Sequence, residues 1–479
     1  MQVSLFLCMQ IFHTSFSANI LFLNTWNSKS HALTMKPFAE RLTIKGHNVS
    51  IYSMTRKSMG SLGNGVHNLE TIVPPEVQTE DQGSVGIVFW YMEMTPEALA
   101  RTHLIGFEYL KHSMQDDMFQ RVISTPYDLV ILDEMFASAQ GAMALAIQKK
   151  FNSKLALFAT TDLISQASMG RGFCRNPVIS PSFYTKTYNI MDCDVTRFID
   201  RLITFKDVIE EQYAAIMVTS RWMQKAGEML NVGSSYETIY EASFGTFTDF
   251  PSRFGFSSPQ SRDLIDIAEH CQEPNELPSD LRQFVEDPNS KGTIYVAFGS
   301  VVTWTVAPPE VIEIFFDVFN SLTDYRIIFS YNGKAVDSVK PHVKILPWAP
   351  QRDILAHKNT ILFFTHGGLK SVKEGICSNT AMLFLPFFAD QPRNSLLARD
   401  MGFAEVIYKK NITKEELTIK INKVLTDGNL LAQLRKLSRQ FLDHVVEPLE
   451  YGTQWAERIM KTSMVQSKYY KNRGRLLSW

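Results

Sequence analysis

Short apolar runs alternate along the chain with longer segments in which apolar residues recur every three or four positions. Near the N-terminus, Ile20–Leu23 is such a run, Leu33–Lys45 is the periodic segment after it, and Val49–Tyr52 is the next run. Gly46 separates the last two, at a position where a helix end favours a left-handed backbone. The runs are typical of buried strands and the periodic segment is typical of a helix. The pattern therefore predicts a strand–helix–strand unit, from which parallel sheets are built.

The same alternation recurs in two further series. In the first, Leu129–Leu132 and Leu155–Phe158 are predicted strands, with a helix over Ser138–Gln148 between them. In the second, a helix over Thr413–Leu425 opens with a capping box. The other elements predicted there are strands at Thr293–Phe298, Arg326–Phe329, Val343–Leu346, Ile361–Phe364 and Met382–Leu385 and a helix over Pro309–Ser321.

A polar stretch separates the two series. Glu269–Ser290 is rich in Pro, Glu, Asp and Asn, which is typical of a linker. A chain of 479 residues is also too long for one compact core. We therefore expect an α/β protein with two Rossmann-like, doubly wound domains that face each other across a cleft. The predicted parts are an N-terminal domain over 19–268, a linker over 269–290, a C-terminal domain over 291–445 and a helical tail over 446–479.

The first residues form a segment of their own. Val3–Phe12 is a short apolar run, and small residues follow within Ser15–Ala18, as at a signal peptidase site. No Lys or Arg precedes the run, so a buried first strand is the alternative. That alternative is weaker because Ile20–Leu23 already supplies a strand directly afterwards. Residues 1–18 are therefore predicted to be a signal peptide.

Composition and charge narrow the class of protein further. The formal net charge of −1 gives no electrostatic basis for nucleic acid as a partner. Five cysteines without a Cys-x-x-Cys pair favour neither a disulfide scaffold nor a zinc site. No later stretch has the roughly twenty apolar residues of a membrane span, which leaves a soluble or peripherally bound chain. Sequons at Asn48 and Asn411 are acceptable sites for N-linked glycans.

A His-Gly-Gly sequence is the centre of the most informative segment. Ile361–Phe364 is a predicted buried strand, and Leu369–Ile376 can form a helix. Between them stand His366, Gly367 and Gly368. Exposed amides at a helix N-terminus favour a pyrophosphate, and glycine lets it approach the main chain. His366 is expected to add a donor that can become charged near neutral pH. A tight turn would explain any single His-Gly-Gly sequence. The residues around it therefore decide between a turn and a phosphate-binding site.

Polar or aromatic residues accompany this sequence at the ends of adjacent predicted strands. Trp348 can stack on uracil, and Gln351 can bond to the base edge or the ribose. Glu374 can accept the ribose hydroxyls, and Asp390 with Gln391 can hold hydroxyls of a sugar. Taken singly, Trp348 could fill a core, Glu374 could lie on a solvated helix face, and Asp390 could cap a helix. Their joint placement favours a nucleotide-sugar site.

Residues 348–391 resemble the signature of the UDP-glycosyltransferase family, the group that contains the glucuronosyltransferases. Ser300 lies in a sequence similar to the family's first phosphate loop, and Ser371 lies inside the signature. The resemblance implies a GT-B fold, a UDP-glucuronate or UDP-glucose donor held by the C-terminal domain, and no metal cofactor. Three features depart from the family pattern. Ala381 replaces a common Pro, and Lys370 replaces a small or amide residue. The Gly-Gly that usually precedes the linker is replaced near Ala268 and Glu269. Lys370 could reach the pyrophosphate or point to solvent.

Glycosyl transfer also needs a base for the acceptor. His31 follows the loop after the first predicted strand, and Asp133 ends the strand Leu129–Leu132, so both belong to the same sheet edge. A carboxylate on the far ring nitrogen fixes the tautomer of the imidazole and stabilises its cation. The family's catalytic His and Asp match these positions in order and context. The expected reaction is a direct displacement that inverts the anomeric centre.

One short pattern points to a metal instead. Asp192, Cys193 and Asp194 form an Asp-x-Asp triplet, which metal-dependent glycosyltransferases of another fold use to hold UDP. The triplet precedes a predicted helix over Thr196–Thr204, so the role of helix N-cap is favoured over the metal.

The acceptor side is less defined. Phe89, Trp90, Tyr91, Met92 and Met94 form an apolar patch that either lines a pocket for lipophilic molecules or packs in a core. The resemblance implies small lipophilic acceptors and a place in the lumen of the endoplasmic reticulum, with possible peripheral membrane contact. A UDP-sugar epimerase and a catalytically impaired UDP-sugar-binding protein are the alternatives. The sequence does not indicate an oligomeric state.

Overall fold

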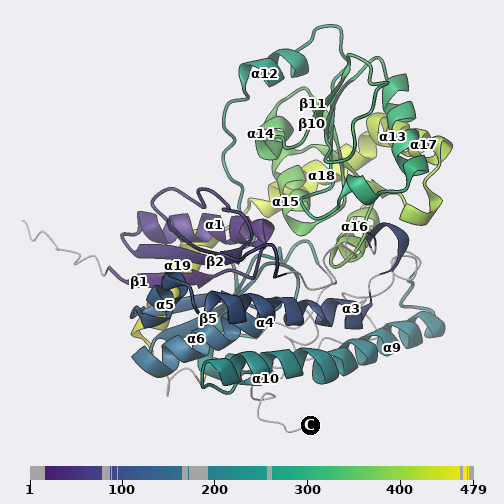
Figure 1. The fold of residues 1–479 in the computed structure, drawn as a ribbon. Helices are drawn as coiled ribbons and strands as arrows, with labels where there is room; N and C mark the ends of the chain where they lie inside the picture. The colour runs from purple at the N-terminus through teal and green to yellow at the C-terminus, as the bar shows by residue number, and fades with distance from the viewer. Residues whose placement is uncertain are drawn as a thin grey trace, which may run out of the picture.

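Two parallel β-sheets, each covered by helices, form the protein (Figure 1). All strand pairs among the described residues are parallel. The expected architecture of two doubly wound α/β domains is therefore confirmed. This computed structural model describes residues 17–77, 87, 89–93, 95–163, 171, 193–255, 261–463, 468–471 and 473.

The N-terminal sheet has seven strands in the order β3-β2-β1-β4-β5-β6-β7. The strand order reverses between β1 and β4, and in such sheets the crevice at the carboxyl ends of these strands is where ligands bind. The four strands predicted in this part of the chain are all present, each at least one residue longer than expected. The bounds are β1 Asn19–Leu23, β2 Asn48–Thr55, β3 His67–Ile72, β4 Leu129–Asp133, β5 Lys154–Ala159, β6 Ser243–Thr248 and β7 Leu264–Asp266.

The first helix begins four residues earlier than its apolar pattern predicts. α1 spans Lys29–Ile44 because the side chain of Ser28 caps it, accepting a hydrogen bond from the backbone N of His31. His31 therefore lies in the first turn of a helix rather than after a loop. The other helices of this domain are α3 Pro96–Ala100, α4 Thr102–Ser113, α5 Asp117–Ser124, α6 Ser138–Phe151, α9 Phe198–Ala214, the π-helical turn η1 Ala215–Thr219, α10 Ser220–Met229 and α11 Tyr236–Ala242.

The C-terminal sheet has six strands in the order β10-β9-β8-β11-β12-β13 and reverses between β8 and β11. Its strands are β8 Thr293–Ala297, β9 Arg326–Ser330, β10 Val343–Leu346, β11 Thr360–Thr365, β12 Ala381–Phe384 and β13 Ala404–Val406. Its helices are α13 Pro309–Ser321, α14 Gln351–Ala356, α15 Leu369–Ser378, α16 Gln391–Asp400, α17 Lys414–Thr426 and α18 Gly428–Phe441, with 3-10 turns η2 Trp304–Val306 and η3 Lys409–Asn411. The predicted linker contains a helix of its own, α12 Ser279–Val285.

The last helix, α19 (Pro448–Lys461), returns from the C-terminal domain to pack on α1. At Gly452 a β-carbon would come within 2.8 Å of Ile267 and 3.0 Å of Phe38, so the helix lies close against the N-terminal domain. Lys45 and Glu450 form an ion pair of 2.6 Å across this contact. In the part of the chain that the structure describes, no helix is long and apolar enough to cross a membrane.

A disulfide joins the linker to the C-terminal domain. Cys271 is bonded to Cys377 near the end of α15. The sequence gives no indication of this pairing, since its five cysteines are scattered. The bond ties the linker directly to the helix that follows the His-Gly-Gly sequence.

The predicted aromatic patch packs mainly on the C-terminal domain. Phe89 stacks on Phe388 with ring centroids 3.7 Å apart, and the indole N–H of Trp90 donates to the carbonyl of Thr303 over 3.0 Å. Phe89 and Trp90 are both buried. These two residues thus pack in a core, which is the second of the two alternatives for the patch. Of the rest of the patch, Tyr91 and Met92 are exposed, and Met94 lies outside the described residues.

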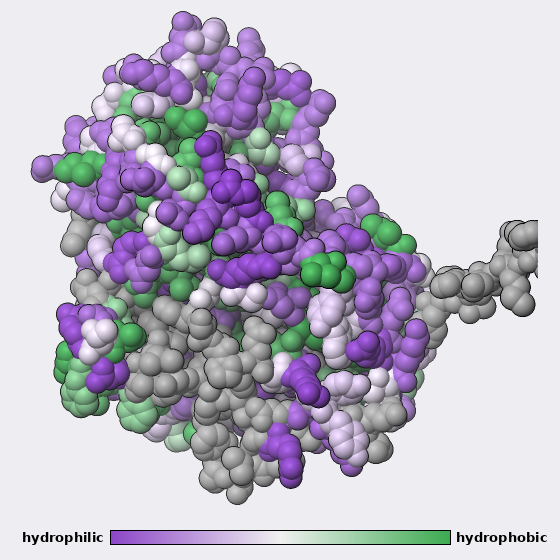
Figure 2. All heavy atoms as spheres, turned by 180° about the vertical axis from the view of Figure 1, so that it is seen from behind, coloured by the Kyte–Doolittle hydropathy of each residue, from purple (hydrophilic) through white to green (hydrophobic). Residues whose placement is uncertain are grey.

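One helix face stands apart as an apolar surface. α9 and η1 expose large apolar side chains, and Figure 2 shows apolar atoms gathered at the lower left of that view. The peripheral membrane contact expected from the sequence stays a prediction. The exposed residues of this surface are Phe198, Ile199, Leu202, Phe205, Ile209, Tyr213, Ile216 and Met217.

Candidate active site

A histidine and an aspartate meet at the carboxyl edge of the N-terminal sheet. Asp133 is the last residue of β4 and is fully buried, and its Oδ2 lies 2.5 Å from Nδ1 of His31. The backbone N of Met135 donates to the other carboxylate oxygen over 3.0 Å, which fixes the carboxylate. The structure thus brings together the two residues predicted to form the catalytic pair, although 102 positions separate them in the chain.

A third side chain belongs to this cluster. The hydroxyl of Thr160 lies 3.0 Å from Nδ1 of His31 and 3.5 Å from Oδ1 of Asp133. Thr160 directly follows β5, the neighbour of β4, so it ends at the same edge of the sheet. Sequence reasoning missed it because a lone threonine after a strand carries no chemical signature, and its position after β5 was the only available signal.

The environment of His31 favours its protonated form. Burial disfavours the imidazolium, but the charge and hydrogen bond of Asp133 outweigh burial, so the pKa of His31 is raised above its ordinary value. Asp390 of the other domain adds to this rise. Because Nδ1 faces Asp133, Nε2 is the nitrogen that can receive a proton from a substrate.

His366 sits in a different environment from the one that the sequence predicts. Burial lowers its pKa to about 4, so it is neutral at neutral pH and does not supply the expected positive charge. Its ring lies between two glycines: a β-carbon at Gly299 would come within 2.9 Å of Nε2, and one at Gly368 within 2.6 Å. Gly299 also has a φ of +73°, which favours glycine. His366 is therefore a neutral hydrogen-bonding group, packed closely between Gly299 and Gly368, which belong to the two predicted phosphate-binding loops.

The acidic residue at the end of the signature is turned towards the start of α15. Oδ2 of Asp390 accepts hydrogen bonds from the backbone N of Leu369 over 3.3 Å and from the side chain of Asn394 over 2.8 Å. Asp390 occupies the N-cap position of α16, but its side chain makes no capping hydrogen bond there. Burial raises the pKa of Asp390 to about 6. The side-chain oxygen of Gln391 accepts hydrogen bonds from the backbone N of Phe387 over 3.0 Å and of Phe388 over 3.2 Å.

The residues predicted to hold the ribose contact one another. The side-chain N–H of Gln351 donates to Glu374 over 2.5 Å and to the hydroxyl of Ser371 over 3.2 Å. The ammonium group of Lys370 lies 3.8 Å from the other oxygen of Glu374, so this partly exposed side chain has a partner in the cluster. Glu374 is only 17% exposed, so it does not lie on a solvated helix face. These four residues form one cluster on α14 and α15.

Trp348 and Ser300 lie at the open side of the same domain. The Trp348 side chain is 64% exposed, which rules out a role as core filler and leaves an aromatic face available for a base. The ammonium group of Lys29, two residues before His31, lies 5.6 Å from its ring centroid. Ser300 is exposed in the turn after β8. Trp348, the predicted contact for uracil, thus lies beside α1, the helix that carries His31.

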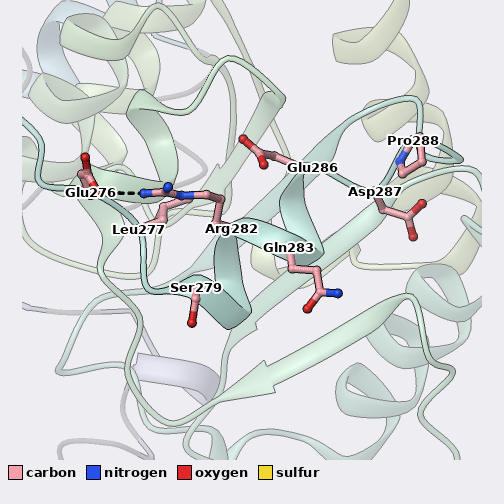
Figure 3. Close-up of a pocket in the computed structure, with 8 residues that line it drawn as sticks. All are labelled: Glu276, Leu277, Ser279, Arg282, Gln283, Glu286, Asp287 and Pro288. Atoms are coloured by element: carbon pink, nitrogen blue, oxygen red, sulfur yellow. Dashed lines mark hydrogen bonds and ion pairs between the residues drawn. The ribbon is translucent and has the colours of Figure 1, made fainter.

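A hollow of about 240 Å³ adjoins the ribose cluster. It is lined by α1 through Leu33 and Pro37, by the linker through residues 270–274, and by Lys370 and Glu374. A second hollow, of about 740 Å³, lies on the linker, where Arg282 and Glu276 pair across 3.0 Å (Figure 3). Its lining contains none of the predicted site residues. Only the first hollow is continuous with the candidate site.

The Asp-x-Asp pattern has a local structural role where it is described. Asp194 accepts hydrogen bonds from the backbone N and hydroxyl of Thr196, and these lower its pKa. α9 begins only at Phe198, so Asp194 closes a turn before the helix and does not cap it. Asp192 lies outside the described residues. Within the described part of the chain, no group of three or more His, Cys, Asp or Glu residues is placed to hold a metal.

Two facing α/β domains, with a His–Asp pair on one and a glycine-bounded helix start on the other, are the arrangement of the GT-B fold. Solved structures of this class share the fold: spinosyn forosaminyltransferase SpnP matches with a TM-score of 0.61 and 15% identity, over 92% of this chain and 99% of that one. Glycosyltransferase VinC in complex with DTDP matches with a TM-score of 0.60 and 15% identity, over the same shares.

The family follows from the sequence comparison. The family model of UDP-glucoronosyl and UDP-glucosyl transferases matches residues 20–479, so the chain belongs to this family of enzymes. A UDP-glucuronosyltransferase of Pleuronectes platessa is 25% identical, over 75% of this chain and 74% of its own. UDP-glycosyltransferase UGT5 of Dactylopius coccus is 24% identical, over 95% of this chain and 87% of its own. The protein is a UDP-glycosyltransferase.

Proposed function

We propose that the protein moves a glucuronosyl or glucosyl group from its UDP-sugar to small lipophilic acceptors, with inversion at the anomeric carbon and His31 as the base. The observation that carries the proposal is the contact between His31 and Asp133. Asp390 of the other domain is near enough to this pair to raise the pKa of His31. A base and a sugar-binding carboxylate on opposite domains are what a direct transfer between two substrates requires.

In the proposed reaction Nε2 of His31 takes the proton of the acceptor hydroxyl, and the acceptor oxygen bonds to the anomeric carbon. The bond from that carbon to the β-phosphate oxygen breaks, and UDP leaves with the electron pair. Asp133 stabilises the imidazolium. Ser300, neutral His366 and backbone amides at the start of α15 are the proposed donors to the leaving pyrophosphate. None of these steps uses a metal ion, and independence from metal remains a prediction.

Product analysis tests the reaction class. The purified protein is incubated with a phenol and either UDP-glucose or UDP-glucuronate, and the products are separated. A phenyl glycoside of inverted configuration supports the proposal, and the donor that gives it identifies the sugar. Interconverted UDP-sugar without glycoside would indicate the epimerase, and bound but unchanged donor would indicate the impaired binding protein. Unchanged rates in excess EDTA are expected.

The assignment of the base has its own test. His31→Ala is expected to lower kcat by about 10²–10⁴-fold, because general-base catalysis contributes that much. Affinity for UDP should stay close to that of the wild type, since Trp348, Gln351 and Glu374 lie on the other domain. Transfer at a near wild-type rate in this variant would refute the role of His31.

We also propose that the protein resides in the lumen of the endoplasmic reticulum. The predicted signal peptide and the bond between Cys271 and Cys377 support this, since disulfides persist in oxidising compartments. Asn48 is exposed, as an acceptor of an N-linked glycan must be, and its side chain donates to Asn19 over 2.9 Å. A mobility shift on glycosidase treatment, smaller in Asn48→Gln, is the expected result.

A further inference from the structure

Two buried ion pairs join the domains beside the candidate site. Arg393 of α16 pairs with Asp162, and Lys373 of α15 pairs with Asp249 over 2.6 Å. All four side chains are less than one-tenth exposed. The two carboxylates follow β5 and β6, at the carboxyl edge of the N-terminal sheet, and the two cations belong to the two helices that carry the predicted sugar and ribose contacts. Each donor-binding helix is thus attached to the catalytic edge of the other domain.

The pair of Arg393 and Asp162 lies next to the reacting groups on both sides. Arg393 stands three residues after Asp390, in the first turn of α16. Asp162 stands two residues after Thr160, whose hydroxyl lies 3.0 Å from Nδ1 of His31. The backbone N of Leu163 donates to Asp162 over 2.8 Å and fixes the carboxylate on its own segment. The ion pair therefore connects α16, the helix of the predicted sugar contacts, to the segment whose Thr160 contacts His31.

Stability alone is a weak reason for such a pair. Removing two charges from water costs several kcal/mol per ion, and replacing a buried pair with packed neutral residues is often neutral for stability. A buried pair does, however, tolerate little change in the distance or direction between its partners, because the lost contact leaves a buried charge uncompensated. The pair is thus suited to holding the two domains in one register.

We propose that Arg393 and Asp162 are positioning residues, which set the donor sugar at Asp390 and Gln391 in register with His31. This inference rests on the proposed function and names residues that act through others. The nucleotide contacts Trp348, Gln351 and Glu374 precede α16 in the chain and do not include either partner. The pair should therefore govern the transfer step far more than the affinity for UDP.

The test is a double variant, Asp162→Asn with Arg393→Met, which removes both charges of the pair together. Its kcat should fall by at least about tenfold, since a misplacement of about 1 Å can cost about 10²-fold. The Kd for UDP and the melting temperature should stay near those of the wild type. The matched control is Asp317→Asn with Lys414→Met, an exposed pair at 3.0 Å in the C-terminal domain, which should change none of the three.

A double variant that folds, binds UDP and turns over at the wild-type rate would overturn the inference, because the pair would then be only structural. Hydrogen exchange provides a readout that is independent of turnover. Amides of residues 160–163 and of the first turn of α16 should exchange faster together in the double variant, and unchanged exchange in both segments would also contradict the proposal. If the wild type forms no glycoside from either donor, the proposed function fails while the exchange measurement still decides the role of the pair.

Discussion

Asp133 determines how readily His31 gives up its proton, and the rate of transfer should report this. The base must be neutral before catalysis, so kcat/KM should rise with pH through the raised pKa of His31. In Asp133→Asn, burial of the imidazole remains while the carboxylate charge is lost, so the pKa of His31 falls. The acid limb of the profile should then move to lower pH and the plateau should drop. An unmoved acid limb would mean that another group limits the rate.

Gly368 is the residue at which close packing can be tested most directly. An alanine β-carbon there would come within 2.6 Å of Nε2 of His366, so the ring would have to leave its position between the two glycines. Gly368→Ala should weaken UDP binding by about tenfold or more, an amount of about 1.4 kcal/mol or above. Gly428→Ala is the control, because a β-carbon at Gly428 meets nothing within 4 Å. Calorimetric titration with UDP measures both.

The site residues differ in how far sequence can reveal them. His366, Glu374 and Asp390 are recognisable because a helix start, a carboxylate two turns later and an acid at the next strand end form a chemical pattern along a short stretch. Thr160 and Arg393 act through partners far away in the chain, so no local pattern marks them. The charge of His366 was predicted wrongly because only the fold determines its burial and hence its pKa.

At the scale of elements, fully apolar strands were predictable and short or polar ones were not. β4, β5 and β11 contain continuous apolar runs and have polar residues only at their ends, as expected of strands buried on both faces. β13 has three residues and includes Glu405, and the edge strand β3 is largely polar, so neither stands out. The start of α1 was missed because its cap, Ser28, precedes the apolar periodicity.

The disulfide on α15 offers a test at the same scale. Cys271 and Cys377 are 106 residues apart, so the bond restricts the unfolded chain over a long loop. Cys377→Ser should lower the free energy of unfolding by about 2–4 kcal/mol. The melting temperature of the wild type should fall on reduction while that of the variant does not change. If the melting temperature of the wild type does not change on reduction, the bond does not stabilise the fold.

The return of α19 to the N-terminal domain links the two halves of the molecule. Gly452 lies where a larger side chain would press on Ile267 and Phe38. Gly452→Val should destabilise the protein by about 1–3 kcal/mol, as overpacking usually does. Gly233→Ala, where a β-carbon meets nothing within 4 Å, is the control. Urea denaturation of both variants measures the difference.

The path of the chain also decides how the molecule can come apart. The polypeptide passes from one domain to the other at the linker and passes back between α18 and α19. A single protease cut in the linker therefore divides the chain into two fragments, and the packing of α19 on the N-terminal domain still attaches the second fragment to the first. A second cut in the return passage removes this attachment. For the same reason an N-terminal domain that ends at residue 268 lacks the helix that covers Phe38 and Ile267. A fragment made for acceptor binding alone should carry residues 448–461 as a separate or fused segment.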